Sequence, residues 1–130
     1  MATEMRGNRV SVEEDAEQWQ VTFAESEFNS RHYVILRRDR APGSQDMALG
    51  LDGYQVEVDH QNQSFYGGIE SFVLFRDHVA VVFNAEAASV LGDGAGIVVR
   101  FSLRARQLDQ LRACLIRIFE GEGCFLDKSA

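Results

Sequence analysis

The stretch Gly53-Tyr54-Gln55-Val56-Glu57-Val58-Asp59 (residues 53–59) has the most regular alternation of apolar and polar side chains in the chain. Successive residues of a β-strand point to opposite faces, so this segment has an apolar face and a polar face. The apolar face carries Tyr54, Val56 and Val58, and the polar face carries Gln55, Glu57 and Asp59. Such a pattern is typical of an antiparallel sheet with one packed and one solvated face.

Further strands are predicted on both sides of this segment. Before it, the strand-like stretches are 10–13, 18–23 and 33–36, the last being apolar on both faces. After it, residues 69–75 and 79–83 are separated by Arg76-Asp77-His78, which fits a tight antiparallel hairpin. A last strand is expected at 97–103. Together these segments predict a mostly antiparallel sheet of six to seven strands.

Two segments have helical features. Residues 85–91 follow Asn84, a suitable N-cap, and precede Gly92, a suitable stop, so a short helix is expected there. Residues 105–119 repeat Leu108, Leu111, Leu115 and Ile118 at helical spacing. This amphipathic helix is expected to pack on one face of the sheet, which makes the fold class α+β. Residues 1–130 are expected to form a single domain, with 120–130 as a loose tail.

The charge of the chain argues against some classes of partner. Thirteen basic and 20 acidic residues give a formal net charge of −7, and residues 41–80 hold only Arg76 against six acids. A net acidic chain without a basic cluster is a poor nucleic-acid binder, because phosphate contacts need Lys and Arg. An acidic face suits a basic protein partner.

Neither a membrane span nor a secretory signal is predicted. No run of about 18 apolar residues is present, and residues 1–15 lack an apolar stretch. The protein is therefore expected to remain in the cytoplasm, without contact to a membrane. Cys114 and Cys124 are expected to be reduced thiols there, and could pair only if the C-terminal tail folds back.

The titratable residues form no recognisable catalytic or metal-binding motif. His32, His60 and His78 lie on three different segments, and none has a second ligand at metal-binding spacing. The glycine-rich run 92–96 follows a helix and precedes a strand, the reverse of a phosphate-binding loop. We therefore expect no metal, no cofactor and no enzymatic activity.

Two alternatives stay open. Glu57 and Asp59 would project to the same side of a strand about 6–7 Å apart, which is compatible with acid–base chemistry. With His60 they would form the site of a small enzyme or ligand-binding domain. A pair of carboxylates that faces solvent or a partner explains the spacing more simply. The other alternative is a homodimeric structural subunit that pairs through its sheet edge or its helix face.

Three blocks of sequence carry a resemblance to a known family. They are Ala48-Leu49-Gly50-Leu51-Asp52-Gly53-Tyr54, then Val56-Glu57-Val58, and then Tyr66-Gly67-Gly68-Ile69-Glu70-Ser71. In these blocks, and in the order of the later elements, residues 31–119 resemble the immunity protein 10 family of bacterial polymorphic-toxin systems. The resemblance implies an α+β protein that binds a cognate toxin in the cytoplasm, blocks it and catalyses nothing.

The resemblance also marks individual positions. We interpret Tyr54, Tyr66, Gly67 and Gly68 as structural, with positive φ at one or both glycines and Tyr66 anchoring the turn against the sheet. Our hypothesis for the toxin-binding patch combines acidic positions that the resemblance marks with two polar positions of the alternating strand. The former are Asp52, Glu57 and Glu70, and the latter are Gln55 and Asp59.

Overall fold

Alternating apolar residues build two five-stranded sheets in the part of the chain that the computed structural model describes, residues 2–25, 32–40, 53–60, 63–91 and 96–129. The first, here called the meander sheet, has its strands in sequence order and all antiparallel. Its strands are β2 (Arg9–Glu14), β3 (Gln18–Ala24), β4 (Tyr33–Asp39), β5 (Gln55–Val58) and β6 (Ser64–Tyr66).

The second sheet, here called the terminal sheet, joins both ends of the chain. Its strand order is β1-β9-β8-β7-β10. The edge strands β1 and β10 pair in parallel with β9 and β7, and the inner pairs are antiparallel. The bounds are β1 (Ala2–Arg6), β7 (Ile69–Leu74), β8 (His78–Phe83), β9 (Gly96–Arg100) and β10 (Phe125–Asp127).

The prediction of an α+β fold is confirmed, but the prediction of one sheet of six to seven strands is wrong. The short strands at 2–6, 64–66 and 125–127 were not predicted, because three to five residues give little periodic signal. Sheet membership also depends on long-range pairing, such as that of Ala2 with Gly96, which no local pattern reveals.

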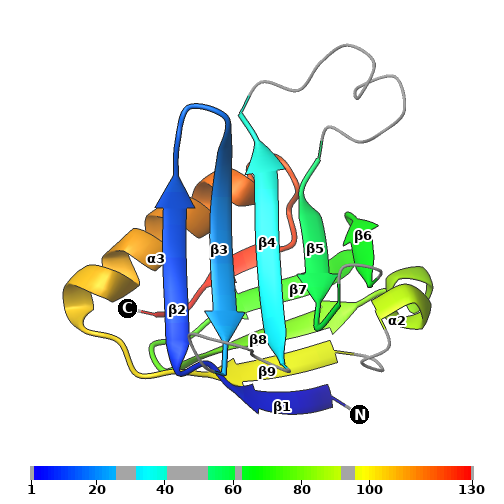
Figure 1. Ribbon diagram of the computed structural model, residues 1–130, viewed down its shortest axis with the longest axis horizontal. Coiled ribbons are helices and arrows are strands. Elements are labelled where there is room, and N and C mark those ends of the chain that lie inside the picture. Colours follow the sequence, from blue (N-terminus) through cyan, green and yellow to red (C-terminus); the bar gives the residue numbers. More distant parts are fainter. Residues whose placement is uncertain (1, 26–31, 41–52, 61–62, 92–95, 130) are drawn as a thin grey trace.

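The core lies between the inner faces of the two sheets and under the last helix. Figure 1 shows the meander sheet in front, the terminal sheet crossing behind its lower part, and α3 behind it above. Helix α3 (Ala105–Ile118) packs on β2, β3, β4 and β10. Its buried residues include all four predicted apolar positions, so the amphipathic helix is confirmed. They are Leu108, Leu111, Cys114, Leu115 and Ile118.

Each of the two described helices has a specific polar contact at one of its ends. Helix α2 (Ala85–Leu91) begins as predicted, with Asn84 Oδ1 accepting the Ala87 N–H at 2.8 Å; its predicted stop, Gly92, lies outside the described residues. At the end of α3, Arg38 Nη1 from β4 donates to the carbonyls of Ile118 at 3.0 Å and Glu120 at 2.7 Å. A cation at this position satisfies free carbonyls and interacts favourably with the negative end of the helix dipole.

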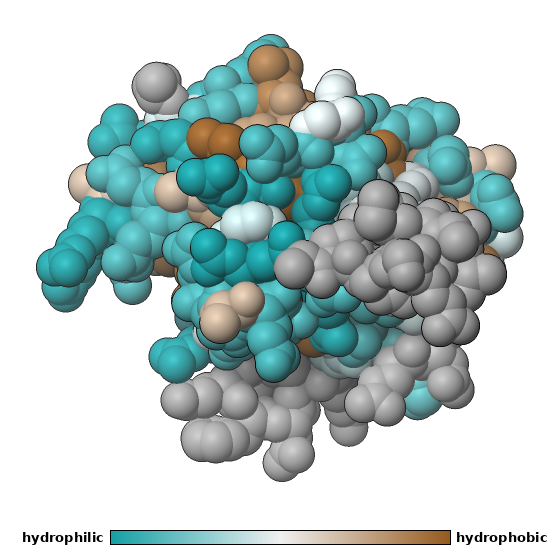
Figure 2. All heavy atoms as spheres, turned by 90° about the horizontal axis from the view of Figure 1, so that it is seen from above, coloured by the Kyte–Doolittle hydropathy of each residue, from teal (hydrophilic) through white to brown (hydrophobic). Residues whose placement is uncertain are grey.

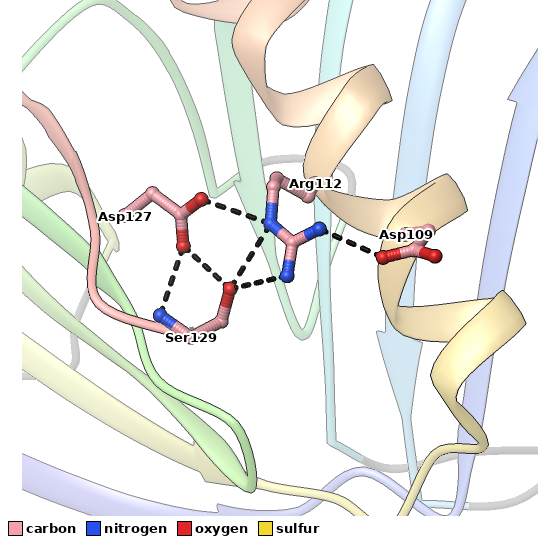
Figure 3. Close-up of polar contacts among 4 residues, drawn as sticks. All are labelled: Asp109, Arg112, Asp127 and Ser129. Carbon is pink, nitrogen blue, oxygen red and sulfur yellow. Dashed lines mark hydrogen bonds and ion pairs between the residues drawn. The ribbon is translucent and has the colours of Figure 1, made fainter.

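The C-terminal segment is not the predicted loose tail. Strand β10 pairs with β7, and the segment that follows is held by Arg112 of α3 (Figure 3). Arg112 donates to Ser129 Oγ through Nε at 3.0 Å and Nη2 at 2.7 Å, and its Nε lies 2.9 Å from Asp127 Oδ2. Its Nη1 donates to Asp109 Oδ1 at 2.8 Å. These contacts join residues far apart in sequence, so residues 120–130 alone did not predict them.

Both cysteines are unpaired, as expected, even though the tail folds back. Cys114 is buried, and burial raises the pKa of its thiol to about 11. Burial also raises the pKa of Cys124. Both thiols are therefore held in the protonated form, which is the less reactive one.

The glycine pair of the third sequence block forms the junction between the two sheets. Gly67 has φ +74° and Gly68 φ +82°, which confirms the predicted positive φ. A Cβ atom at Gly68 would lie 2.6 Å from Ala87 Cβ and 2.7 Å from Phe65 Cδ1, so only glycine fits. The buried Tyr54 joins the same junction, since its hydroxyl accepts the Ile69 N–H at 3.0 Å.

Candidate protein-binding surface

The outer face of the meander sheet is the face turned away from the core. Figure 1 shows it toward the viewer, with no described helix or strand in front of it. The strand registers place one row of residues across β4, β5 and β6 next to another. The first row contains Arg37, Gln55 and Tyr66, and the second contains Ile35, Glu57 and Ser64. Half-buried side chains on a sheet face that no described helix or strand covers are available to a partner.

A polar cluster joined by one hydrogen bond and one ion pair, here called the Arg37 cluster, stands at the centre of this face. It consists of Tyr33, Arg37 and Glu57. The Tyr33 hydroxyl donates to Glu57 Oε2 at 2.7 Å, and Arg37 Nη2 lies 3.8 Å from Glu57 Oε1. Burial and the hydrogen bond to Glu57 raise the pKa of Tyr33 to about 12, so its hydroxyl stays protonated and remains a donor.

Glu57 is therefore not the solvated carboxylate that the alternation predicted. It is 9% exposed, among the least exposed charged residues described. Its position on the outer face is as predicted, but Tyr33 and Arg37 cover it from the neighbouring strand. Sequence alternation assigns a face to a residue and does not show which neighbours cover it.

Arg37 is the member of the cluster with unused hydrogen-bonding capacity. Its Nε is buried and finds no hydrogen-bond partner within the described residues. Its side chain is 33% exposed and lines a shallow depression with Asp39, Gln55 and Tyr66. Tyr66 is 43% exposed on this face, and its role as an anchor of the turn stays a prediction. Arginine and tyrosine are among the residue types most enriched where protein interfaces concentrate their binding energy.

Asp59 does not share the outer face with Gln55 and Glu57. Strand β5 ends at Val58, and Asp59 takes a positive φ of 62°. Its Oδ1 accepts the Tyr33 N–H at 2.9 Å, and its Oδ2 lies 3.3 Å from His32 Nδ1. Asp59 thus fastens the start of β4 to the end of β5, and the predicted i, i+2 alternation stops one residue earlier.

The described structure does not place the other two members of the hypothesised patch on this face. Glu70 is exposed, but it lies on β7 of the terminal sheet. Asp52 lies outside the described residues. Of the five residues in the hypothesis, the structure places Gln55 and Glu57 on the outer face of the meander sheet.

The alternative catalytic set is divided between separate contacts. Glu57 binds Tyr33 and Arg37, whereas Asp59 binds the Tyr33 backbone and His32. His60 lies in the turn that follows, where its N–H donates to the Val58 carbonyl at 2.7 Å. Within the described residues, no three or more His, Cys, Asp or Glu side chains gather into a set that could hold a metal ion.

An acidic turn marks one end of the molecule. Glu13, Glu14, Asp15 and Glu17 are all exposed around the turn between β2 and β3. Backbone N–H groups of Glu17 and Gln18 donate to Asp15 Oδ1 at 2.8 and 2.9 Å and lower the pKa of Asp15. Figure 2 looks onto this end, where hydrophilic side chains predominate and apolar ones appear only in separate small patches. No helix in the described ranges is long and apolar enough to cross a membrane.

Sequence reasoning missed Tyr33 and Arg37. Residues 33–36 read as a strand that is apolar on both faces, which directed attention to packing. The available signal was that the strand continues to Arg37. Alternation then places Tyr33, Ile35 and Arg37 on one face of the strand, and the buried Val34 and Leu36 on the other. Pairing that outer set with Gln55 and Glu57 would have predicted the cluster.

Comparison with known proteins yields one family. A family model described as Immunity protein 10 matches residues 6–109, more than half of the chain. The match contains all three sequence blocks that carried the resemblance, from Ala48 to Ser71. None of the curated proteins matches the chain.

Proposed function

Because the chain belongs to the Immunity protein 10 family, we propose that it binds a cognate bacterial toxin in the cytoplasm and neutralises it. The proposal is one of binding without catalysis. It is supported by the engagement of Glu57 and Asp59 in contacts within the fold, which leaves the enzymatic alternative with little support. No metal or cofactor is needed for such a role.

The proposed toxin-binding surface is the outer face of the meander sheet around Arg37. It keeps Gln55 and Glu57 from the sequence hypothesis and adds Arg37 and Tyr66. Arg37 carries the proposal, because its buried Nε finds no acceptor among the described residues and the exposed third of its side chain leaves the guanidinium within reach of a partner's carboxylate or carbonyl. Glu57 and Tyr33 would hold the guanidinium in place, while Asp59 supports the edge of the face. Glu70 and Asp52 are secondary in this proposal.

The chemistry of the proposed contact differs from that of the original hypothesis. An exposed acidic patch would meet a basic toxin surface, but the one acidic residue placed at the centre of this face is covered. The exposed groups are a guanidinium, an amide and a phenol. We therefore expect the toxin to present an acceptor to Arg37 and a flat surface to Tyr66.

Co-expression with the toxin domain encoded beside this protein tests the proposal. Wild-type protein should protect growing cells, and Arg37→Ala and Tyr66→Ala should each weaken toxin binding by roughly 2 kcal/mol, the level of interface residues that matter most. Arg100→Ala is the matched control, because Arg100 is exposed on the terminal sheet and pairs with Glu4.

The possible outcomes distinguish the proposal of an immunity function from the proposal of where the toxin binds. Failure of the wild-type chain to protect would contradict the immunity proposal as a whole. Full protection and unchanged affinity in both variants, each folded by circular dichroism, would instead move the toxin to another surface. Cell fractionation of the tagged protein checks the proposed cytoplasmic location.

A further inference from the structure

Strand β2 is an edge strand with the features of a pairing surface. It forms one edge of the meander sheet, and in the described part of the chain it pairs only with β3. Its six residues make it the longest edge strand of either described sheet. Exposed edges are usually blunted by proline, by a bulge or by charged side chains, lysine above all. The sequence Arg-Val-Ser-Val-Glu-Glu has no proline or lysine, and its register with β3 is unbroken from Arg9 to Glu14. Its charged residues are Arg9, Glu13 and Glu14, of which a second copy of the strand can pair Arg9 with Glu13.

A groove runs along the inner side of this edge. It lies between β2 and the outer side of α3 and has a volume of about 510 Å³. It is lined by Val12, Glu14, Gln110, Ala113, Cys114 and Arg117. Val10 and Val12, the inward residues of β2, are only half-buried, because the sheet ends before it covers the helix fully. Another strand beside β2 would cover these valines.

The order of residues along β2 is self-complementary. We propose that β2 pairs antiparallel with β2 of a second copy of this chain, about a twofold axis that passes beside Ser11. Such an axis, perpendicular to the sheet, leaves outward-facing residues on the outer face of the joined sheet. Each outward residue of β2 must therefore lie opposite an outward residue of the second copy, and each inward residue opposite an inward one. With Ser11 facing Ser11, Arg9 faces Glu13 of the second copy and Val10 faces Val12 of the second copy.

This register satisfies both faces of the joined sheets. On the outer face it makes two cross-strand pairs of opposite charge, and on the inner face it makes two apolar pairs over the grooves. A register centred on Val12 would place Val10 opposite the carboxylate of Glu14 and Ser11 opposite Glu13. A register centred on Val10 would set Arg9 opposite Ser11 and move Glu13 past the end of the facing strand. The alternation of charge and apolar residues therefore selects Ser11 as the centre.

The pairing joins the two meander sheets into one and brings the two grooves together across the axis. It leaves the Arg37 cluster uncovered, since that cluster lies on the outer face across β4 and β5. The dimer is therefore independent of the proposed toxin surface, and its test needs no toxin.

Sedimentation and light scattering over a concentration series measure the state of the wild-type chain. We expect a species of about twice the 14.6 kDa chain mass that dissociates on dilution. A monomer at every concentration up to the solubility limit would overturn the proposal.

A cysteine placed on the axis tests the register. Facing residues in an antiparallel pair have Cα atoms about 4.5–5.5 Å apart, within the range that a disulfide spans. Ser11→Cys should therefore give a covalent dimer on mild oxidation. Glu13→Cys is the matched control, because four residues separate the two copies of position 13 along the strand, about 13 Å. Wild-type protein, with Cys114 and Cys124 only, should give none. Efficient linking through position 13 and not 11 would overturn the proposed register.

Reversing the charges of Arg9 and Glu13 tests the proposed charge pairs between the two copies of β2. Arg9→Glu or Glu13→Arg alone sets like charges opposite each other twice and should raise the dimer dissociation constant roughly tenfold. An equimolar mixture of the two single variants should restore dimers, because β2 of the first variant is acidic at both positions 9 and 13, while β2 of the second is basic at both. Equal dimerisation of all these proteins, each with wild-type melting, would show that β2 is not the interface.

Discussion

Two clusters in this molecule contain the same three chemical groups and use them differently. The Arg37 cluster joins an arginine, a carboxylate (Glu57) and a hydroxyl (Tyr33) across β4 and β5. The second, here called the Arg112 cluster, joins Arg112, Asp127 and Ser129 between α3 and the C-terminal segment. Arg112 contacts its partners at 2.7–3.0 Å, whereas Arg37 lies 3.8 Å from its carboxylate.

The difference lies in how completely each guanidinium is satisfied. Arg112 donates in three directions, to Ser129, Asp127 and Asp109, and so fastens one part of the chain to another. Arg37 keeps a buried Nε without a hydrogen-bond partner in the described structure, on a face that no described element covers. A satisfied arginine stabilises the fold, and an unsatisfied one is available to a partner.

The largest expected effect comes from removing the support under the Arg112 cluster. Leu111 precedes Arg112 on α3 and is fully buried. Leu111→Ala should lower the free energy of unfolding by about 2–5 kcal/mol, through lost burial and the cavity that remains. Urea denaturation measures it, with Arg106→Ala, exposed on the same helix, as a control that should change little. A wild-type midpoint for Leu111→Ala would show that α3 does not anchor the core.

A somewhat smaller loss is expected when the carboxylate of the Arg37 cluster is reversed. Glu57→Lys would place a cation beside Arg37 and leave the Tyr33 hydroxyl without its acceptor, at a cost of about 2–3 kcal/mol. Glu70→Lys, at an exposed position of the same hypothesised patch, should cost under about 0.5 kcal/mol. Thermal unfolding of the two variants is the measurement. If Glu57 were solvated, as expected from the sequence, Glu57→Lys and Glu70→Lys would melt at the same temperature.

Breaking the Arg112 cluster itself should have a local effect. Arg112→Ala removes the donors to Ser129 and Asp127 and should cost about 1–2 kcal/mol. The backbone amides of β10 should exchange with deuterium faster, while those of β4 and β5 keep their protection. Arg117→Ala, on the exposed side of α3, is the control. Unchanged exchange in β10 would mean that strand pairing alone holds the segment.

The smallest expected effect is that of low pH on the Arg112 cluster, through protonation of Asp127. Burial raises the pKa of Asp127, but hydrogen bonds from Ser129 and the charge of Arg112 outweigh it and hold that pKa below its ordinary value. A depressed pKa contributes stability above the unfolded-state value of about 3.9, which is lost as pH falls further through the folded value. The protection factors of the β10 amides, which correct for the pH dependence of intrinsic exchange, should therefore fall below about pH 4. Asp127→Asn should already show the lower protection factors at pH 7, and these should change little on acidification.

The parts of the fold predicted from sequence are those with local signals. Leu108, Leu111, Leu115 and Ile118 revealed α3 through their spacing, and Gly67 and Gly68 revealed a turn that requires positive φ. The division into two sheets was not predicted, because it depends on β1 meeting β9 and β10 meeting β7. Periodicity along one segment contains no information about which distant segment lies beside it.

The candidate site was predicted only in part for a related reason. Alternation correctly put Gln55 and Glu57 on the outer face. It could not show that Tyr33 and Arg37 cover Glu57, since those contacts cross between strands. Asp59 left the face because its carboxylate binds the Tyr33 N–H, a turn contact that replaces the expected continuation of the strand.

The parallel edge strands of the terminal sheet have a consequence for the timing of synthesis. The meander sheet consists of sequence neighbours and can close while later residues are still being added. Strand β1 must wait for β9, some ninety residues later, which at ribosomal rates takes roughly 5–20 s. Strand β7 must wait for β10, which is the last strand to emerge. A nascent chain would thus contain all the strands of the meander sheet before the terminal sheet and α3 cover their inner face, so any protection it gives a cell should lag behind translation.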